Sequence, residues 1–274
     1  MKNSIFITFV IFVVLCCPPV SAQNGDVKTY KGEFDMVGFA WKYFGYWNGF
    51  GIITAVNGLA TYHYRELDGG RQVFEGDFSF EKSPKNERDS QYEARGTFKN
   101  DRQIGKWIWK QHTYEDKSEL YSECVFNFDD DGWLHGQFDM NFSHTWKGGR
   151  GFVNTYHETS KVTGVMENGV LVSVNFRDND YLTVEGRYNK DGKPIGKWTL
   201  EGKLCENRKY IVTYDSNGRI ADAYYINPRT GGRVNANINS ITMYIDGFSL
   251  QPAHEMKKLI MTAIMAHLFR LTPK

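Results

Sequence analysis

A short motif, apolar-x-Gly-x-aromatic, recurs along this chain of 274 residues and constrains its fold more than any other feature. The copies at Gly96 and Gly186 are each followed by a polar turn and the same tetrapeptide, Ile-Gly-Lys-Trp, which ends at Trp107 and Trp198. Recurring units of this size are typical of architectures in which each unit packs on its neighbours. The motif is centred on Gly32, Gly76, Gly96, Gly136 and Gly186, with looser copies at Gly58 and Gly164.

The hydrophobic pattern around these glycines has a period of two. Every second residue of 92–99 and of 182–189 is apolar or glycine, and the residues between them are polar or charged. This alternation predicts antiparallel strands with one buried and one solvated face. Turn sequences such as Asp191-Gly192 and Asn217-Gly218 separate the runs and favour tight hairpins. We therefore predict an all-β fold, in which antiparallel β-hairpin repeats form an elongated, twisted open sheet or a solenoid.

The repeated glycines fall on the face that is predicted to be buried. A glycine inside a strand loses packing and costs backbone entropy, so another group has to fill the space. An aromatic ring from a neighbouring strand can cover the bare backbone. The chain has 19 Phe, 16 Tyr and 7 Trp for this purpose. We interpret these rings as core, and we interpret the motif glycines, with Trp107 and Trp198, as structural residues that define the repeat.

The first 22 residues are typical of a secretory signal peptide. A short basic start precedes an apolar run from Ile5 to Leu15, and Ser21-Ala22 provides a small-residue cleavage site. We predict that the mature chain begins at Gln23 and is exported to the periplasm, the outer membrane or the medium. The alternative is a lipoprotein acylated at Cys17, but larger residues precede this cysteine than lipidation sites favour.

Charge and cysteine content limit the predicted partners and cross-links. Loss of Lys2 with the leader takes the formal net charge from +1 to zero, which does not favour nucleic acid as a partner. Cys124 and Cys205 would remain in the mature chain. An oxidising compartment allows a disulfide between them, and geometry decides whether it forms. The chain has no Cys-x-x-Cys motif, so neither a zinc site nor a thioredoxin-like site is predicted.

The C-terminal segment breaks the period of two. From Glu255 to Leu271 the apolar residues recur at helical spacing. We predict a helix over 251–274, after a repeat domain over 23–250. The helix would cap the last apolar face of the array. The alternative is contact with a membrane surface or a partner, because Lys257 and Lys258 flank a helix that is apolar on almost all sides.

The chain resembles the MORN-repeat superfamily in Tyr30 to Phe34, in Phe74 to Phe78 and in the two Ile-Gly-Lys-Trp segments. It is more similar to bacterial variants of the repeat with Gly-Lys-Trp in the second strand, and the resemblance covers roughly residues 30–225. The resemblance implies a β-hairpin array and a scaffold or binding role, and eukaryotic relatives are linked to membranes and protein assembly. It implies no shared catalytic residues. The export signal does not fit the cytoplasmic antitoxin role ascribed to some bacterial relatives.

Motifs for chemistry are few. The run Asp129 to Gly132 lacks the spaced oxygen ligands of an EF-hand, and a hairpin turn accounts for it, so no metal site is predicted. The chain has no His-Glu-x-x-His, Gly-x-Ser-x-Gly or phosphate-loop motif, so we assign no catalytic residue and no cofactor. Two converging carboxylates would leave no linear motif, so an envelope hydrolase stays as a third alternative.

The leading functional hypothesis is an exported, non-enzymatic repeat protein that acts as a scaffold or protein-binding surface in the cell envelope. The alternative is a carbohydrate- or peptidoglycan-binding module that stacks sugars on exposed rings. The partner would accordingly be a protein or an envelope glycan. Rings buried on one sheet face would favour the scaffold, and a row of exposed rings would favour glycan binding. The candidate binding residues lie in irregular segments: Trp41, Trp47, Trp133 and Trp146.

Overall fold

The computed structural model describes residues 26–39, 53–83, 89–115, 118–148, 154–179 and 182–236. These residues form fourteen strands and one short 3-10 helix, η1 (Lys203–Cys205). The strands are β1 (Lys28–Phe39), β2 (Ile53–Glu66), β3 (Gln72–Lys82), β4 (Gln91–Lys99), β5 (Arg102–Glu115), β6 (Ser118–Phe128), β7 (Gly136–Gly148), β8 (Asn154–Glu167), β9 (Val170–Asp178), β10 (Leu182–Tyr188), β11 (Pro194–Glu201), β12 (Lys209–Tyr214), β13 (Ile220–Ile226) and β14 (Arg233–Asn235).

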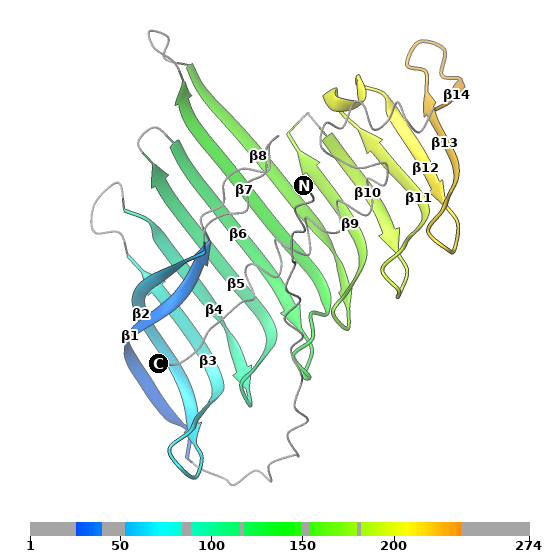
Figure 1. Ribbon diagram of the computed structural model, residues 1–274. Coiled ribbons are helices and arrows are strands. Elements are labelled where there is room, and N and C mark those ends of the chain that lie inside the picture. The colour runs from blue at the N-terminus through cyan, green and yellow to red at the C-terminus, as the bar shows by residue number, and fades with distance from the viewer. Residues whose placement is uncertain are drawn as a thin grey trace, which may run out of the picture.

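The fourteen strands make one sheet, in which each strand pairs with its neighbours in the chain. Every pairing is antiparallel, and the strands follow one another side by side from β1 to β14 (Figure 1). The first and last strands do not pair with each other, so the sheet is open. The prediction of an all-β array of antiparallel hairpins is confirmed in its open-sheet form. The predicted signal peptide and C-terminal helix lie outside the described residues.

One face of the sheet carries the core. Every second residue from Ser122 to Phe128 in β6, and from Leu182 to Tyr188 in β10, is buried. Rings on neighbouring strands pack on this face, for example Phe98 of β4 on Trp107 of β5, with ring centroids 4.9 Å apart. Such pairs contribute about 0.5–1.5 kcal/mol each beyond the burial of their area. The predicted alternation, and the interpretation of the rings as core, are therefore confirmed for these strands.

Several motif glycines lie beneath an aromatic ring, as predicted. A methyl group built on Gly96 would lie 2.1 Å from the Trp107 ring, and one built on Gly186 would lie 2.0 Å from the Trp198 ring. Neither position has room for a side chain, because the ring rests on the backbone. Three other glycines are covered by the ring or hydroxyl of an aromatic residue in the same way: Gly32 by Tyr30, Gly58 by Phe80 and Gly164 by Phe138.

Gly76 and Gly136 differ, and their prediction as ring-covered positions is wrong. Gly76 has φ +95° and Gly136 has φ +82°, a backbone conformation that favours glycine. Gly76 lies in a β-bulge, where residues 75–77 face the single residue His63. Gly136 begins β7, and the nearest atom to a methyl group built on it is the Asn127 Cβ, at 3.9 Å. Both glycines are needed for backbone shape rather than for ring packing.

Both Ile-Gly-Lys-Trp segments form β-bulges. Residues 105–107 of β5 face the single residue Gly96, and residues 196–198 of β11 face Gly186. The bulge glycines, Gly105 and Gly196, have φ +63° and +65°. Each bulge directs its tryptophan onto the facing glycine in the core, while the lysine before it is exposed. The tetrapeptide therefore joins a core position to a position on the polar face.

The two cysteines of the described chain are free and buried. Cys124 lies on β6 and Cys205 in η1, which follows β11. Strands lie about 4.8 Å apart, so the five steps from β6 to β11 cover roughly 24 Å. A disulfide needs Cα atoms within about 7 Å of each other. The disulfide that the sequence left open is therefore absent, because the sheet separates the two residues.

Slow alkylation of both thiols is the expected result for the folded protein. Burial raises the pKa of Cys205 to about 11 and raises the pKa of Cys124 well above its ordinary value. A raised thiol pKa lowers the thiolate fraction at about pH 8, and the thiolate is the reactive form. We expect iodoacetamide to modify each residue at least about a hundredfold more slowly in buffer than in denaturant. Peptide mapping by mass spectrometry measures this, and equal rates would contradict the burial.

Candidate functional site

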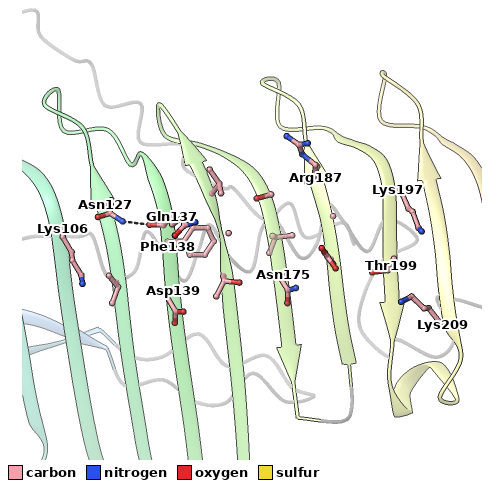
Figure 2. Close-up of a pocket in the computed structure, with 18 residues that line it drawn as sticks. Lys106, Asn127, Gln137, Phe138, Asp139, Asn175, Arg187, Lys197, Thr199 and Lys209 are labelled. Atoms are coloured by element: carbon pink, nitrogen blue, oxygen red, sulfur yellow. Dashed lines mark hydrogen bonds between the residues drawn. The ribbon is translucent and has the colours of Figure 1, made fainter.

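The polar face of the sheet is hollowed across β5 to β12. This depression, called the polar hollow below, has a volume of about 1130 Å³ (Figure 2). Its floor is a row of residues that pair in register from β6 to β11. The row consists of Val125, Asp139, Thr163, Asn175, Glu185 and Thr199. The alternation that buries the rings on one face therefore gathers small, polar and charged side chains on the other.

Four cations border the polar hollow: Lys106 on β5, Arg187 on β10, Lys197 on β11 and Lys209 on β12. The ammonium of Lys209 lies 3.7 Å from a carboxylate oxygen of Glu201. The other three cations make no ion pair or hydrogen bond among the described residues.

The two carboxylates of the polar hollow differ in how they are compensated. The Asp139 carboxylate lies 2.8 Å from the ammonium of Lys161. Glu185 has no ion-pair partner within the described part of the chain. The polar hollow therefore contains three cations without an ion-pair partner and one such carboxylate, which gives it an excess of positive charge. This excess is local, because the formal net charge of the whole chain is only +1.

The two Ile-Gly-Lys-Trp bulges place a lysine at each end of the polar hollow. Lys197 lies on β11 between the residues that pair with Arg187 and Glu185. Lys106 occupies the corresponding bulge position on β5, and Figure 2 shows the two lysines on opposite sides of the depression. Sequence reasoning missed these residues. The repeated tetrapeptide was the signal that could have found them. Its lysine precedes the buried tryptophan, so the alternation of side chains along a strand places the lysine on the opposite, polar face.

The rest of the lining is uncharged, and it combines amide and hydroxyl side chains with small apolar residues. It includes the amides of Asn127, Gln137 and Asn175, and the side-chain amide of Asn127 donates to the backbone carbonyl of Gln137 at 2.6 Å (Figure 2). Among the lining residues, Phe138 is the single aromatic one; it is only 3% exposed and belongs to the core face. The polar hollow therefore offers charge and hydrogen bonds, but no exposed ring on which a sugar could stack.

The predicted tryptophan candidates are not brought together. Trp133 is 59% exposed in the turn between β6 and β7, and it lies against the β8–β9 turn, where a methyl group built on Gly169 would be 3.2 Å from its ring. Trp146 is part of β7, and its side chain is not described. Trp41 and Trp47 lie outside the described residues. Among the described side chains, Trp133 is therefore the one exposed tryptophan, and it is not part of the lining of the polar hollow.

The acidic run before Trp133 is a turn, as predicted. A carboxylate oxygen of Asp129 accepts hydrogen bonds from the backbone N–H groups of Asp131 and Trp133, at 3.0 and 2.8 Å. These bonds hold the carboxylate against the backbone of its own hairpin. Within the described ranges, no three His, Cys, Asp or Glu residues come together in a way that could hold a metal ion.

A second polar cluster lies at one end of β8 and β9. Ser160 and Asp178 pair in register, and the serine hydroxyl donates to the carboxylate of Asp178 at 2.9 Å. Burial raises the pKa of this carboxyl, the charge of Glu158 raises it further, and the serine hydrogen bond lowers it. We interpret the cluster as structural, because the serine hydroxyl and the carboxylate satisfy each other's hydrogen-bonding capacity directly.

A second depression of about 950 Å³ lies on the polar face of β1 to β4. Its charges are closely balanced, with Lys31, Lys82 and Arg95 against Glu33 and Glu81. The ammonium of Lys82 also lies 2.9 Å from the carboxylate of Asp89. This depression therefore lacks the positive excess of the polar hollow, and it serves as an internal comparison.

Comparison with known proteins adds no functional assignment. No protein-family model matches the chain, and no characterised protein matches it significantly in sequence. None of the helical residues in the described ranges forms a helix long and apolar enough to cross a membrane. The candidate site therefore rests on its own geometry: a long polar depression with uncompensated cations on an open, repeat-built sheet.

Proposed function

We propose that this chain is an exported, non-enzymatic scaffold protein of the cell envelope, and that the polar face of its sheet binds another protein. The polar hollow carries the proposal, because it crosses eight consecutive strands, β5 to β12, and is lined by side chains that can pair with a protein surface. Pockets for small molecules normally enclose most of the ligand. A depression of this length therefore suits an extended protein surface better than a small molecule. The resemblance to MORN repeats supports the same role.

The spacing of the carboxylates in the polar hollow weighs against a glycoside hydrolase. Asp139 and Glu185 lie in the same row, on β7 and β10, which are three strand steps apart. Three steps of about 4.8 Å amount to roughly 14 Å. Paired carboxylates that hydrolyse glycosidic bonds stand about 5 to 9.5 Å apart. Within the described lining there is also no histidine or cysteine.

Glycan binding is the second candidate, and it depends on Trp133. This residue is 59% exposed, and an exposed indole can stack on a sugar ring. The other described tryptophans argue for the scaffold, because Trp107, Trp109 and Trp198 are buried on the core face. Trp133 is the one exposed tryptophan among the described side chains, and one ring offers little area for a polymer, so we favour the protein partner.

Site-specific photo-crosslinking in the source cells tests the proposed function. A photoreactive phenylalanine analogue is introduced at Thr163, on the floor of the polar hollow, and separately at Asp191, in an exposed turn of the same sheet. We expect irradiation to give a discrete protein adduct from position 163 and none from position 191. Absence of an adduct, or the same adducts from both positions, would overturn the proposal. The mass of the recovered chain also tests export, since a mature protein should begin at Gln23.

A further inference from the structure

We propose that the polar hollow binds an extended acidic segment of its partner protein, with Lys106, Arg187 and Lys197 contacting the acidic side chains. This inference rests on the proposed function, and it adds the chemical character of the partner. The three cations are exposed and have no anionic partner among the described residues. Each can therefore accept a carboxylate from outside without first breaking an internal ion pair.

The cations at the two ends of the polar hollow complement the negative charges of an acidic segment. Arg187 and Lys197 lie on adjacent strands at one end of the polar hollow, and Lys106 lies at the other end (Figure 2). A guanidinium can bind a carboxylate through two parallel hydrogen bonds, and an ammonium adds a point charge. Complementary charge across an interface steers association and rejects partners of the wrong sign. The balanced depression on β1 to β4 has no comparable excess, so the acidic segment should prefer the polar hollow.

The dimensions of the polar hollow suit an extended segment. Lys106 is on β5 and Lys197 on β11, which are six strand steps apart. Six steps of about 4.8 Å amount to roughly 29 Å along the sheet. An extended chain advances about 3.3 Å per residue, so about nine residues would join the two ends. A single carboxylate metabolite is too short to contact both lysines.

The neutral lining favours a peptide over an acidic polysaccharide. Asn175 and Thr163 present amide and hydroxyl groups between the two cationic ends, and Thr199 adds a hydroxyl beside Lys197 on β11. These groups can donate to carbonyl oxygens and accept from N–H groups, which recur along a peptide backbone. A polysaccharide would gain from exposed rings, and the described lining offers only the buried Phe138. We therefore assign the acidic ligand to a protein.

Fluorescence anisotropy with defined probes tests the inference on the purified full-length chain. The probe is a fluorescein-labelled peptide of alternating Glu and Gly, about ten residues long to match the span. The matched probe has Gln in place of each Glu. We expect the Glu peptide to bind more tightly than the Gln peptide, and we expect about 0.5 M NaCl to abolish the difference, because salt screens exposed charges.

Paired charge-removing variants locate the binding site. Arg187→Gln with Lys197→Gln should raise the Kd for the Glu peptide at least about tenfold, and Lys106→Gln alone should raise it severalfold. The control double variant, Lys190→Gln with Lys193→Gln, removes the same charge from exposed residues of the neighbouring turn. It should leave the Kd within about twofold. Circular dichroism confirms that each variant is folded, as expected for exposed positions.

Four results would overturn the inference: no binding of the Glu peptide, equal binding of the Gln peptide, an equal loss in the control variant, or preferential binding of polygalacturonate or polyphosphate. The last result would assign the polar hollow to an anionic polymer other than protein. These outcomes are distinct from failure of the proposed function. A protein adduct from position 163 that persists in the Arg187→Gln, Lys197→Gln background would leave the scaffold role standing and remove only its acidic specificity.

Discussion

Replacement of Trp107 by alanine is expected to lower the free energy of unfolding by about 4 kcal/mol. The indole is fully buried, with 0% of its surface exposed. It stacks on Trp109, with ring centroids 5.3 Å apart, and it covers the bare backbone of Gly96. Its Nε1–H group also donates to the backbone carbonyl of Thr97 at 3.2 Å. Alanine removes the ring contacts, opens a cavity between strands and leaves that carbonyl without its donor.

Trp133→Ala is the matched control for this variant. The same indole is lost, but from a side chain that is 59% exposed, so the free energy of unfolding should change by no more than about 0.5 kcal/mol. Urea unfolding followed by far-UV circular dichroism measures both variants without relying on tryptophan emission. A loss below about 1 kcal/mol for Trp107→Ala would contradict its place in the core.

A double-mutant cycle between Gly186 and Trp198 should show strong coupling. Gly186→Ala alone should cost about 3 kcal/mol, because the new methyl group would lie 2.0 Å from the Trp198 ring. Trp198→Ala alone should cost about 4 kcal/mol, since only 1% of the side chain is exposed. Once the ring is absent, the methyl group no longer overlaps it. The double variant should therefore be more stable than the sum of the single effects predicts, by at least about 1 kcal/mol.

The control cycle combines Gly186→Ala with Trp107→Ala. Trp107 covers a different glycine, Gly96, and lies five strand positions away, on β5 rather than β10. The two effects should add within about 0.5 kcal/mol. Urea unfolding of the three single variants, the two double variants and the parent measures both couplings. Equal couplings in the two cycles would show that the ring on Gly186 is not the cause of the glycine requirement.

Much of the fold follows from residue order alone. The alternation in 92–99 and in 182–189 predicts two strands, and both form with the predicted face buried, as β4 and β10. The ring cover on Gly96 and Gly186 was also predictable, because a strand glycine on a core face needs a neighbour to fill its space. The backbone role of Gly76 was not predictable. Alternation indicates which face of the sheet a residue occupies, but it does not indicate where a β-bulge requires a positive φ.

The candidate site was predictable only in part. The exposed Trp133 was among the predicted binding residues, but Lys106, Arg187 and Lys197 were not. Alternation assigns dozens of charged residues to the polar face, and no local rule selects among them. Which cations converge depends on the register of all strands between β5 and β11, and each bulge shifts that register.

The sequence by itself determined the strand pattern, the buried ring face and the need for glycine beneath the rings, because side-chain direction in a strand alternates with every residue. It also identified both Ile-Gly-Lys-Trp segments, in which Lys106 and Lys197 precede the tryptophans, as copies of one repeated unit. Only the tertiary structure decided that these two lysines stand at opposite ends of one hollow with Arg187, and that Cys124 and Cys205 remain apart. The physical reason is that strand pairing makes neighbours of residues that are distant in the sequence. The register of each pair decides which residues meet, and every β-bulge shifts that register.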